Sequence, residues 1–334
     1  MRFVFAISIA LSSFLVGCGP RTTLGSSGES AARITHLTWF VYIVFIAVAL
    51  TMFALLLLIL TRRRGSLTEK PTLERNEGET WIFVGGLAIP GAILAIIFFV
   101  SIRVLASFPA RASEEAAAEI RVTGHQWWWQ VEYLGATPDQ NVTTANEIHI
   151  PAGEPVDIAL RSDDVIHSFW VPALHGKVDL IPGLENHVRV EALYPGVYHG
   201  QCAQFCGAQH AHMMITVVAQ APSDFRAWLA SQRADAAEPV TDQQREGQEV
   251  FLSRPCGFCH TIRGTVAGGR VGPDLTHFGS RMELAAGTLP NSDGNLEAWI
   301  THAQSIKPGA KMPNLTQFNG EELRAVAAYL DQLR

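Results

Sequence analysis

Four side chains that bind soft metal ions lie within a short segment near the middle of the chain. These are Cys202, Cys206, His210 and Met213. Thiolate and thioether sulfurs, combined with imidazole, favour copper over hard cations. A mononuclear copper site would supply one cysteine in this position. Two cysteines four residues apart suit a pair of copper ions bridged by both sulfurs.

Such a pair needs a second imidazole, and His167 is the best candidate because it lies at the end of a predicted strand. Two alternatives use the same residues. A disulfide between Cys202 and Cys206 suits an exported domain, and zinc accepts cysteine and histidine. The histidine and methionine that follow the second cysteine argue against a disulfide, and a thioether is an unusual zinc ligand. His212 is left out of the predicted set.

A second motif, Cys-Gly-Phe-Cys-His, is typical of covalent haem c attachment. Cys256 and Cys259 would form the thioethers, and His260 would bind the iron. A zinc or redox Cys-x-x-Cys is the alternative, but the adjacent histidine and the predicted export favour haem. Met312 is the best candidate for the sixth ligand, and Met282 is its rival. Histidine–methionine ligation raises the haem potential.

The N-terminus predicts export and a lipid anchor. Arg2 precedes a short apolar run that is too short to span a bilayer and is typical of a signal peptide over residues 1–17. The run ends in Leu-Val-Gly-Cys, which resembles a lipobox, so we expect Cys18 to be lipidated. An ordinary signal peptide with an incidental cysteine is the alternative. A Ser/Gly-rich tether follows as far as residue 35. All five cysteines then have a role.

Two longer apolar runs predict a transmembrane hairpin over residues 36–105. The spans are expected at about 37–60 and 81–103, and each exceeds the ~20 residues that a spanning helix needs. Trp39 and Trp81 lie near span ends, where indoles favour the interface. The loop between the spans is cationic and therefore cytoplasmic by the positive-inside rule, so both termini lie outside. Its basic residues are Arg62, Arg63, Arg64, Lys70 and Arg75.

The exported part divides into two domains of different patterning. Short alternating strands separated by Pro-Gly turns predict an all-β antiparallel sandwich or barrel over residues 115–220. Residues 221–241 are expected to form a helix capped by Ser223, followed by a linker. Over residues 242–334 the apolar residues recur at the spacing of an α-helix. Asp242 is the expected cap of a first helix, and residues 319–330 form an amphipathic last helix.

Composition and charge narrow the function classes. The 334 residues are 48% hydrophobic and 17% charged, which excludes disordered and collagen-like chains. No block of Lys and Arg dominates, so we expect no nucleic-acid partner. Residues 111–226 hold 6 basic and 14 acidic residues, a net charge of −8, whereas residues 242–334 have a net charge of −1. The predicted sandwich is therefore the acidic part.

These motifs together resemble subunit II of haem–copper cytochrome c oxidase, over about residues 30–230. The resemblance rests on the copper motif and on several flanking segments. The family implies a multidomain membrane protein in which a cupredoxin-like domain, carrying the binuclear CuA centre, follows a two-helix transmembrane hairpin. The flanking segments are Gly-His-Gln-Trp-Trp-Trp from residue 124, His-Ser-Phe-Trp-Val-Pro from 167, Lys-Val-Asp-Leu-Ile-Pro-Gly from 177 and Tyr-His-Gly-Gln-Cys from 198.

The resemblance also implies roles for single residues. The CuA ligands would be His167, Cys202, Cys206, His210, Met213 and the backbone carbonyl of Gln204. Trp127 matches the electron-entry tryptophan of the family, although the alternative is that all three tryptophans at 127–129 merely pack in a strand. The family commonly has glutamate at position 204, where it also helps to hold magnesium. A neutral amide is a weaker ligand for that hard cation, so magnesium is not assigned.

A C-terminal all-α class I cytochrome c domain makes the chain resemble the caa(3)-type oxidases. The segment from Val271 to Leu275 resembles the loop that supports the axial histidine, and Met312-Pro before a last helix resembles the end of that domain. Electrons would pass from an external donor, either a soluble cytochrome c or a quinol-oxidising complex, to one covalent haem c and then to CuA. Subunit I would reduce dioxygen and pump protons. The expected location is the bacterial inner membrane, in contact with lipid and other oxidase subunits.

Three other classes of protein fit these residues less well. Nitrous oxide reductase also carries CuA, but it needs a second copper-cluster domain for which this chain has no room. A quinol oxidase subunit II lacks the copper ligands that are present here. A copper-storage or copper-delivery lipoprotein would need neither a haem nor two spans.

Overall fold

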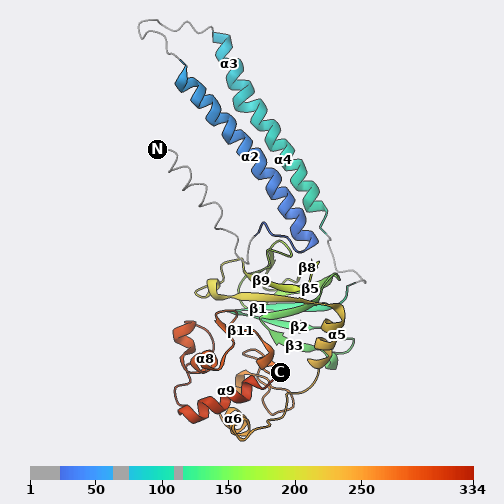
Figure 1. The fold of residues 1–334 in the computed structure, drawn as a ribbon, viewed down its shortest axis with the longest axis vertical. Helices are drawn as coiled ribbons and strands as arrows, with labels where there is room; N and C mark the ends of the chain where they lie inside the picture. Colours follow the sequence, from blue (N-terminus) through green and yellow to red (C-terminus); the bar gives the residue numbers. More distant parts are fainter. Residues whose placement is uncertain (1–22, 63–74, 109–115) are drawn as a thin grey trace, which may run out of the picture. The chain divides into compact units, whose positions relative to one another are not determined.

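The computed structural model describes residues 23–62, 75–108 and 116–334. The expected signal peptide, Cys18 and most of the cationic loop lie outside these residues. The chain forms two compact units, one of residues 32–110 and one that joins residues 1–31 to residues 111–334. Each unit is described by itself (Figure 1).

The smaller unit contains two helical segments that are long and apolar enough to cross a membrane, Glu29–Thr61 and Gly78–Ala106. The first begins earlier than the expected span. The second contains a single π-helical turn. Large apolar side chains are exposed along both segments, as expected of helices whose solvent is lipid. The elements are α2 (Glu29–Thr61), α3 (Arg75–Phe83), η1 (Val84–Ala88) and α4 (Ile89–Ala106).

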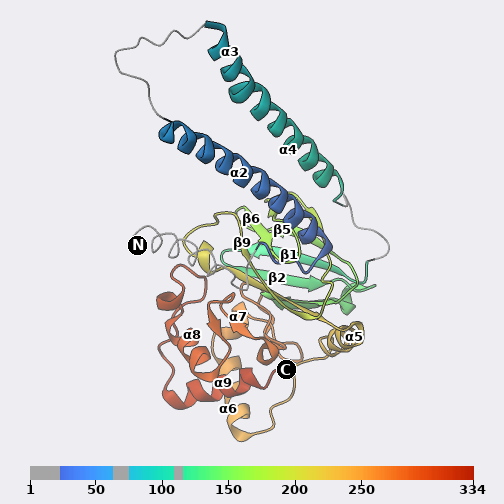
Figure 2. The same cartoon turned by 45° about the horizontal axis from the view of Figure 1, so that its top comes forward.

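Two five-stranded sheets build the first part of the larger unit (Figure 2). One has the order β3-β2-β1-β5-β8 and the other β4-β10-β9-β6-β7. The strands are β1 (Glu119–His125), β2 (Trp128–Tyr133), β3 (Val142–Ala145), β4 (Glu147–Pro151), β5 (Val156–Ser162), β6 (His167–Trp170), β7 (Val178–Leu180), β8 (Asn186–Val190), β9 (Gly196–Cys202) and β10 (Met214–Gln220).

The sandwich is mixed rather than antiparallel, so that part of the prediction was wrong. β1 pairs in parallel with β5, and β10 pairs in parallel with β4, while the other pairs are antiparallel. Alternation along a strand reports which face is buried but not the direction of its neighbour. The apolar core between the sheets includes fully buried Trp129, Phe169 and Met213.

Helices form the rest of the larger unit. The first of them, α5, packs on β4 and β10 of the sandwich, and the later helices enclose a separate apolar core. The amphipathic last helix, α9, packs extensively on α6, and fully buried Tyr329 contacts Phe251 between them. A two-stranded hairpin interrupts the helices. The elements are α5 (Pro222–Ser231), α6 (Asp242–Ser253), α7 (Cys256–Cys259), β11 (Glu283–Leu284), β12 (Leu289–Pro290), α8 (Asp293–Ile306) and α9 (Gly320–Asp331), with short 3-10 turns η2 (Pro138–Gln140), η3 (His210–His212) and η4 (Phe278–Ser280).

Two expected helix caps were wrong. Ser223 does not cap α5, because the N-cap is Ala221 and Pro222 occupies the first turn, where a missing N–H costs nothing. Asp242 lies inside α6. Thr241 is its N-cap and forms a capping box with Gln244.

Candidate metal centres

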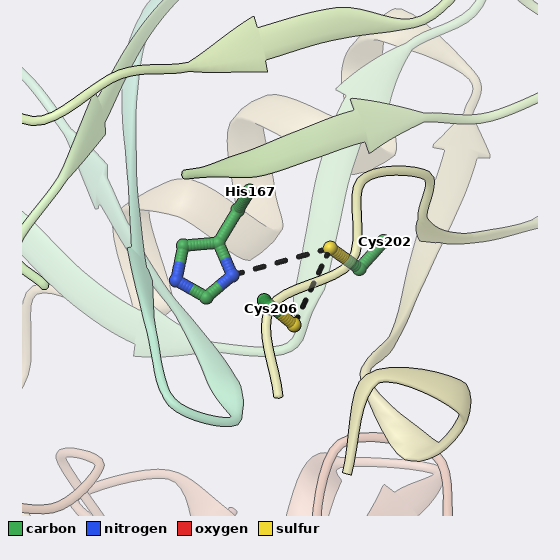
Figure 3. Close-up of side chains that lie close together, drawn as sticks. All are labelled: His167, Cys202 and Cys206. Atoms are coloured by element: carbon green, nitrogen blue, oxygen red, sulfur yellow. Dashed lines mark hydrogen bonds between the residues drawn. The ribbon is translucent and has the colours of Figure 1, made fainter. Parts of the chain in front are cut away.

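Two cysteine sulfurs and a histidine nitrogen gather at one end of the sandwich (Figure 3). The Sγ atoms of Cys202 and Cys206 are 3.8 Å apart, and Nδ1 of His167 is 3.9 Å from the sulfur of Cys202. On the other side, Nδ1 of His210 and Sδ of Met213 lie 3.6 and 3.8 Å from the sulfur of Cys206. The structure therefore brings together all five side chains that the sequence singled out.

Adjacent strands position the first half of this cluster. His167 opens β6 and Cys202 ends β9, and the two strands pair with Phe169 opposite Cys202. The loop after β9 then carries Cys206, and η3 carries His210. The loop connects two paired strands of one sheet, so the sheet holds the cluster side chains rigidly. A rigid cluster suits a metal centre that keeps the same ligands throughout its function.

A sixth donor comes from the main chain. The carbonyl oxygen of Gln204 lies 3.2 Å from the sulfur of Cys202, while the Gln204 side chain is exposed. His212 is also exposed, and its ring contacts Gln209 at 3.0 Å rather than either sulfur.

A carboxylate fixes the ring of His167. Oδ1 of Asp164 lies 2.8 Å from Nε2 of the ring, which leaves Nδ1 directed at the sulfur of Cys202. The backbone N–H of Gln126 donates to the other carboxylate oxygen at 2.7 Å. A carboxylate that holds the second nitrogen of a ligating histidine sets its tautomer and orientation. Gly124 makes room for the ring, because a Cβ there would lie 2.8 Å from a His167 carbon.

The protonation of the cluster is uneven. The hydrogen bond with Cys206 is the main cause that lowers the pKa of Cys202, and the same shared contact, with burial, raises the pKa of Cys206. Burial alone would lower the pKa of His167, but its hydrogen bonds to Cys202 and Asp164 raise it. One thiolate forms readily, and the second needs a cation to replace its proton.

The donor set fits copper. Two thiols, two imidazoles, a thioether and a carbonyl are soft or intermediate donors. Cys202 and Cys206 are free cysteines in the structure, and each sulfur faces the other sulfur and one imidazole. The 3.8 Å between the two sulfurs is well beyond the ~2.05 Å of a disulfide bond, and the donor set suits soft cations such as copper.

The indole of Trp127 lies against the same loop. Its Nε1–H donates to the carbonyl oxygen of Cys206 at 3.0 Å, and the side-chain amide of Gln126 donates to that oxygen at 2.8 Å. Of the three consecutive tryptophans, Trp129 is fully buried in the core, as the packing alternative requires, whereas Trp127 and Trp128 are only partly buried. The three neighbours therefore differ in their surroundings, with Trp129 in the core and Trp127 against the loop.

A largely apolar pocket lies among the C-terminal helices. All four predicted haem-binding residues line it: Cys256, Cys259, His260 and Met312. The rival Met282 is not among its lining residues. Trp127 lines the same pocket, although it belongs to the sandwich. One indole therefore touches both the copper loop and the pocket of the second motif.

Hydrogen bonds orient both expected axial ligands. Nδ1 of His260 lies 2.7 Å from the carbonyl oxygen of Pro273, which leaves Nε2 for a metal, and burial lowers the pKa of this imidazole. The predicted supporting loop at 271–275 therefore contacts the histidine. The side-chain amide of Gln304 donates to the carbonyl of Met312 at 2.6 Å and so holds the methionine loop. A histidine and a methionine that line one apolar pocket fit a haem.

Sequence reasoning missed several residues of the site. Asp164 had a local signal, because it stands three residues before His167, but nothing in the sequence joins Gln126 to Cys206 across 80 positions. Lys307 is also missed, although it is almost fully buried and contacts the sandwich.

Two family models match the chain. "Cytochrome C oxidase subunit II, periplasmic domain" matches residues 135–220, and "Cytochrome c" matches residues 244–334. The periplasmic domain of subunit II of cytochrome oxidase from Bradyrhizobium japonicum is a solved structure with 26% identity and a TM-score of 0.34, covering 37% of this chain and 97% of that one.

Whole-chain relatives extend these matches. The cytochrome c oxidase subunit 2 of Bacillus subtilis is 27% identical and covers 96% of this chain and 94% of the relative. The cytochrome c oxidase subunit 2 of Alkalihalophilus pseudofirmus is 36% identical over 331 residues, which is 97% of this chain and 95% of the relative. The chain therefore belongs to the cytochrome c oxidase subunit 2 family, with a cytochrome c domain fused at its C-terminal side.

Proposed function

We propose that this chain is the electron-entry subunit of a caa(3)-type oxidase. It would accept electrons through one covalent haem c, transfer them to a binuclear CuA centre and deliver them to the haem–copper site of subunit I, which reduces dioxygen to water and pumps protons. One observation carries the proposal. The five side-chain donors cluster around the loop whose Cys206 carbonyl accepts a hydrogen bond from Trp127, and Trp127 also lines the pocket with the haem-attachment motif.

The copper ions would be held by His167, Cys202, Cys206, His210, Met213 and the carbonyl of Gln204, and the haem by Cys256, Cys259, His260 and Met312. When bound, each centre supplies one-electron redox chemistry. The protein holds the donors still. Asp164 fixes one imidazole, the paired strands fix the first sulfur, and Gln304 fixes the methionine loop. A fixed donor set favours rapid transfer because little has to move.

Trp127 is the proposed electron-entry residue. Its indole nitrogen is hydrogen-bonded to the carbonyl of Cys206, and its ring lines the pocket that would hold the haem. The side chain therefore gives a short path of bonded and touching atoms from one pocket to the other. In this fused chain the tethered haem domain, and not a separate protein, faces that indole.

The partners and location follow from the family and the two apolar helices. Subunit I and other oxidase subunits would surround the hairpin in the bacterial inner membrane, with both metal domains on the periplasmic side. The external donor would be a soluble cytochrome c or a quinol-oxidising complex that reduces the haem domain. Lipidation of Cys18 would add a second anchor. With a neutral amide at Gln204, magnesium is not assigned.

Purification of the protein from membranes tests the proposal. We expect two copper ions and one haem c per chain, the visible and near-infrared absorption of mixed-valence copper, and co-isolation of a large haem-containing subunit that consumes oxygen. Mononuclear or absent copper would contradict the CuA assignment. Isolation without an oxygen-consuming partner would favour the copper-storage alternative instead.

A further inference from the structure

A buried lysine joins the haem domain to the sandwich. Lys307 follows α8 in the haem domain, and its side chain is only 2% exposed. Its Nζ donates to three carbonyl oxygens, those of Trp127 at 2.8 Å, His212 at 2.7 Å and Ala285 at 2.7 Å. Two of these oxygens belong to the sandwich. Both domains lie in the same compact unit of the chain.

The chemistry of this contact is unusual. Lysine is almost never fully buried unless it is paired, and no carboxylate of residues 23–62, 75–108 or 116–334 is recorded in an ion pair with Lys307. The three carbonyl oxygens match the three N–H bonds of an ammonium group, which has no acceptor capacity of its own. Burial lowers the pKa of Lys307 to about 7, whereas acceptance of all three N–H bonds favours the protonated form.

The two sandwich carbonyls that accept hydrogen bonds from Lys307 belong to residues beside the proposed path from haem to copper. One belongs to Trp127 itself. The other belongs to His212, which lies between the expected ligands His210 and Met213. The next residue of the haem domain continues the contact, because the side-chain amide of Gln209 donates to the carbonyl of Pro308 at 2.9 Å. A single loop of the haem domain is therefore fastened to both the indole and the copper loop.

Two glycines let the indole fit between the domains. Gly207, in the copper loop, has φ +114°, and a Cβ there would lie 3.1 Å from a Trp127 ring carbon. Gly309, in the loop that leads to Met312, has φ +86°, and its Cβ would lie 3.3 Å from two other carbons of the same ring. The ring thus contacts one loop from each domain, and a side chain at either glycine would press on the ring and strain the positive-φ backbone.

A hairpin of the haem domain supports the same contact from the side. The residues that join β11 to β12 include Ala285 and Ala286, whose φ angles are 51° and 57°. This left-handed backbone is uncommon for residues other than glycine. It directs the carbonyl of Ala285 to Lys307 and that of Ala286 to the backbone N–H of Met214, 2.9 Å away. Strain of this kind persists only where surrounding contacts hold it.

We propose that Lys307 is a positioning residue that holds the haem domain in one docked pose, with Trp127 clamped between the haem pocket and the copper loop. This inference rests on the proposed function, since it assigns the geometry of its haem-to-copper transfer. The fused haem then does not search for its acceptor before each transfer. In this pose the indole is covered by the haem domain, so an external donor delivers its electron to the haem domain and not to Trp127.

The test uses Lys307→Met in the full chain within the purified oxidase, with Arg324→Met as the control. Methionine keeps most of the volume and removes all three donated bonds. Arg324 is an exposed cation of α9, so its loss changes the charge of the haem domain equally. Photoreduction of the haem followed by the near-infrared absorption of the copper centre gives the intramolecular transfer rate. Hydrogen exchange at the Met214 amide, which crosses the interface, reports docking without any redox step.

In Lys307→Met we expect transfer to slow at least tenfold and to become dependent on solvent viscosity, because the domains must now meet by diffusion. Exchange at Met214 should accelerate by a similar factor, and both metal spectra should stay unchanged. Arg324→Met should match the unaltered protein in every measurement. A Lys307→Met protein with normal transfer, no viscosity dependence and normal exchange would overturn the inference.

If Lys307→Met loses its haem, Gln209→Leu decides the question from the sandwich side. It removes the neighbouring bond to Pro308 without a change in the haem domain. Faster exchange at Met214 and viscosity-dependent transfer are expected, and unchanged values would overturn the inference. A different result would contradict the proposed function. If photoreduced haem in the unaltered protein never reduces copper, that function is contradicted, whereas exchange at Met214 still tests the clamp.

Discussion

At the scale of single residues, the metal cluster depends on a side chain that does not touch a metal. Asp164 accepts hydrogen bonds from the His167 ring and from the backbone of Gln126, the residue before the proposed entry tryptophan. It therefore joins the orientation of a ligand to the position of the indole. A residue of this kind matters for metal binding because a ligating imidazole without such a partner can rotate away from the metal.

Asp164→Asn should lower copper affinity about tenfold, because loss of the carboxylate charge at a ligating histidine typically costs 10- to 100-fold. Copper content after dialysis against a graded chelator measures the effect. Asp163→Asn is the matched control, since its side chain is 66% exposed and lies 3.4 Å from His125, away from the cluster. Equal copper retention in both variants would show that Asp164 does not support the site.

The cysteine assignment predicts a thiol count. In mature protein unfolded with a strong chelator, we expect two titratable thiols per chain, from Cys202 and Cys206, because thioethers would hold Cys256, Cys259 and the lipidated Cys18. The fully loaded folded protein should give none. A count of zero after unfolding would indicate a disulfide in the copper loop. Three thiols would show that Cys18 is not lipidated, and a larger count would show that the haem is not attached.

At the scale of elements, α9 illustrates a helix start that holds two parts of the haem domain together. Asn319 accepts from the backbone N–H groups of Glu321 and Glu322, and Glu322 completes the capping box. The carboxylate of Glu322 also pairs with Arg254, next to the haem-attachment motif, at 2.8 Å. That hydrogen bond is the main cause that lowers the pKa of Glu322.

The lowered pKa gives the sign of a pH effect. Because the folded pKa of Glu322 lies below its unfolded value, its stabilisation is fully present above the unfolded pKa, ~4.3, and is lost as pH falls through the folded pKa. Glu322→Gln keeps the cap but removes the charge. Thermal unfolding followed by haem absorbance should show a lower midpoint for Glu322→Gln near pH 7 and a shrinking difference below pH ~4. Glu321→Gln, at an exposed neighbouring position, is the control and should leave the unfolding midpoint almost unchanged. If the midpoint difference between Glu322→Gln and the unaltered protein does not depend on pH, the ion pair is contradicted.

The elements also show what sequence could and could not predict. The two apolar spans, the strands and the amphipathic last helix have local patterns, and family matches and structure bear out that fold class. The proposed copper ligands from Cys202 to Met213 were visible because they lie within twelve residues of one another. The parallel pairs β1–β5 and β4–β10 and the contacts of buried Lys307 join positions far apart in the chain, so no local sequence pattern predicts them. Asp164 has a local signal, three residues before His167, but its contact with Gln126 has none.

At the scale of the whole molecule, the acidic sandwich takes on a different meaning in a fused chain. A negative surface attracts a separate basic donor over long distances, and salt screens that attraction. Here the cytochrome c domain shares the chain with its proposed acceptor, so its effective concentration is high without any steering. The contact that holds it uses a buried lysine and carbonyl oxygens, which bulk ions do not reach.

We therefore expect transfer from the tethered haem to copper to depend only weakly on salt, with less than about a twofold change in rate between 20 and 300 mM salt, a range in which the Debye length falls from roughly 20 Å to under 10 Å. Flash photoreduction at several salt concentrations measures this rate. Reduction of the haem by a basic external cytochrome, measured in the same preparation, is the internal control, because an encounter between separate proteins should slow as salt rises. A steep loss of haem-to-copper transfer with salt would mean that surface charge, and not the buried contact, brings the two domains together.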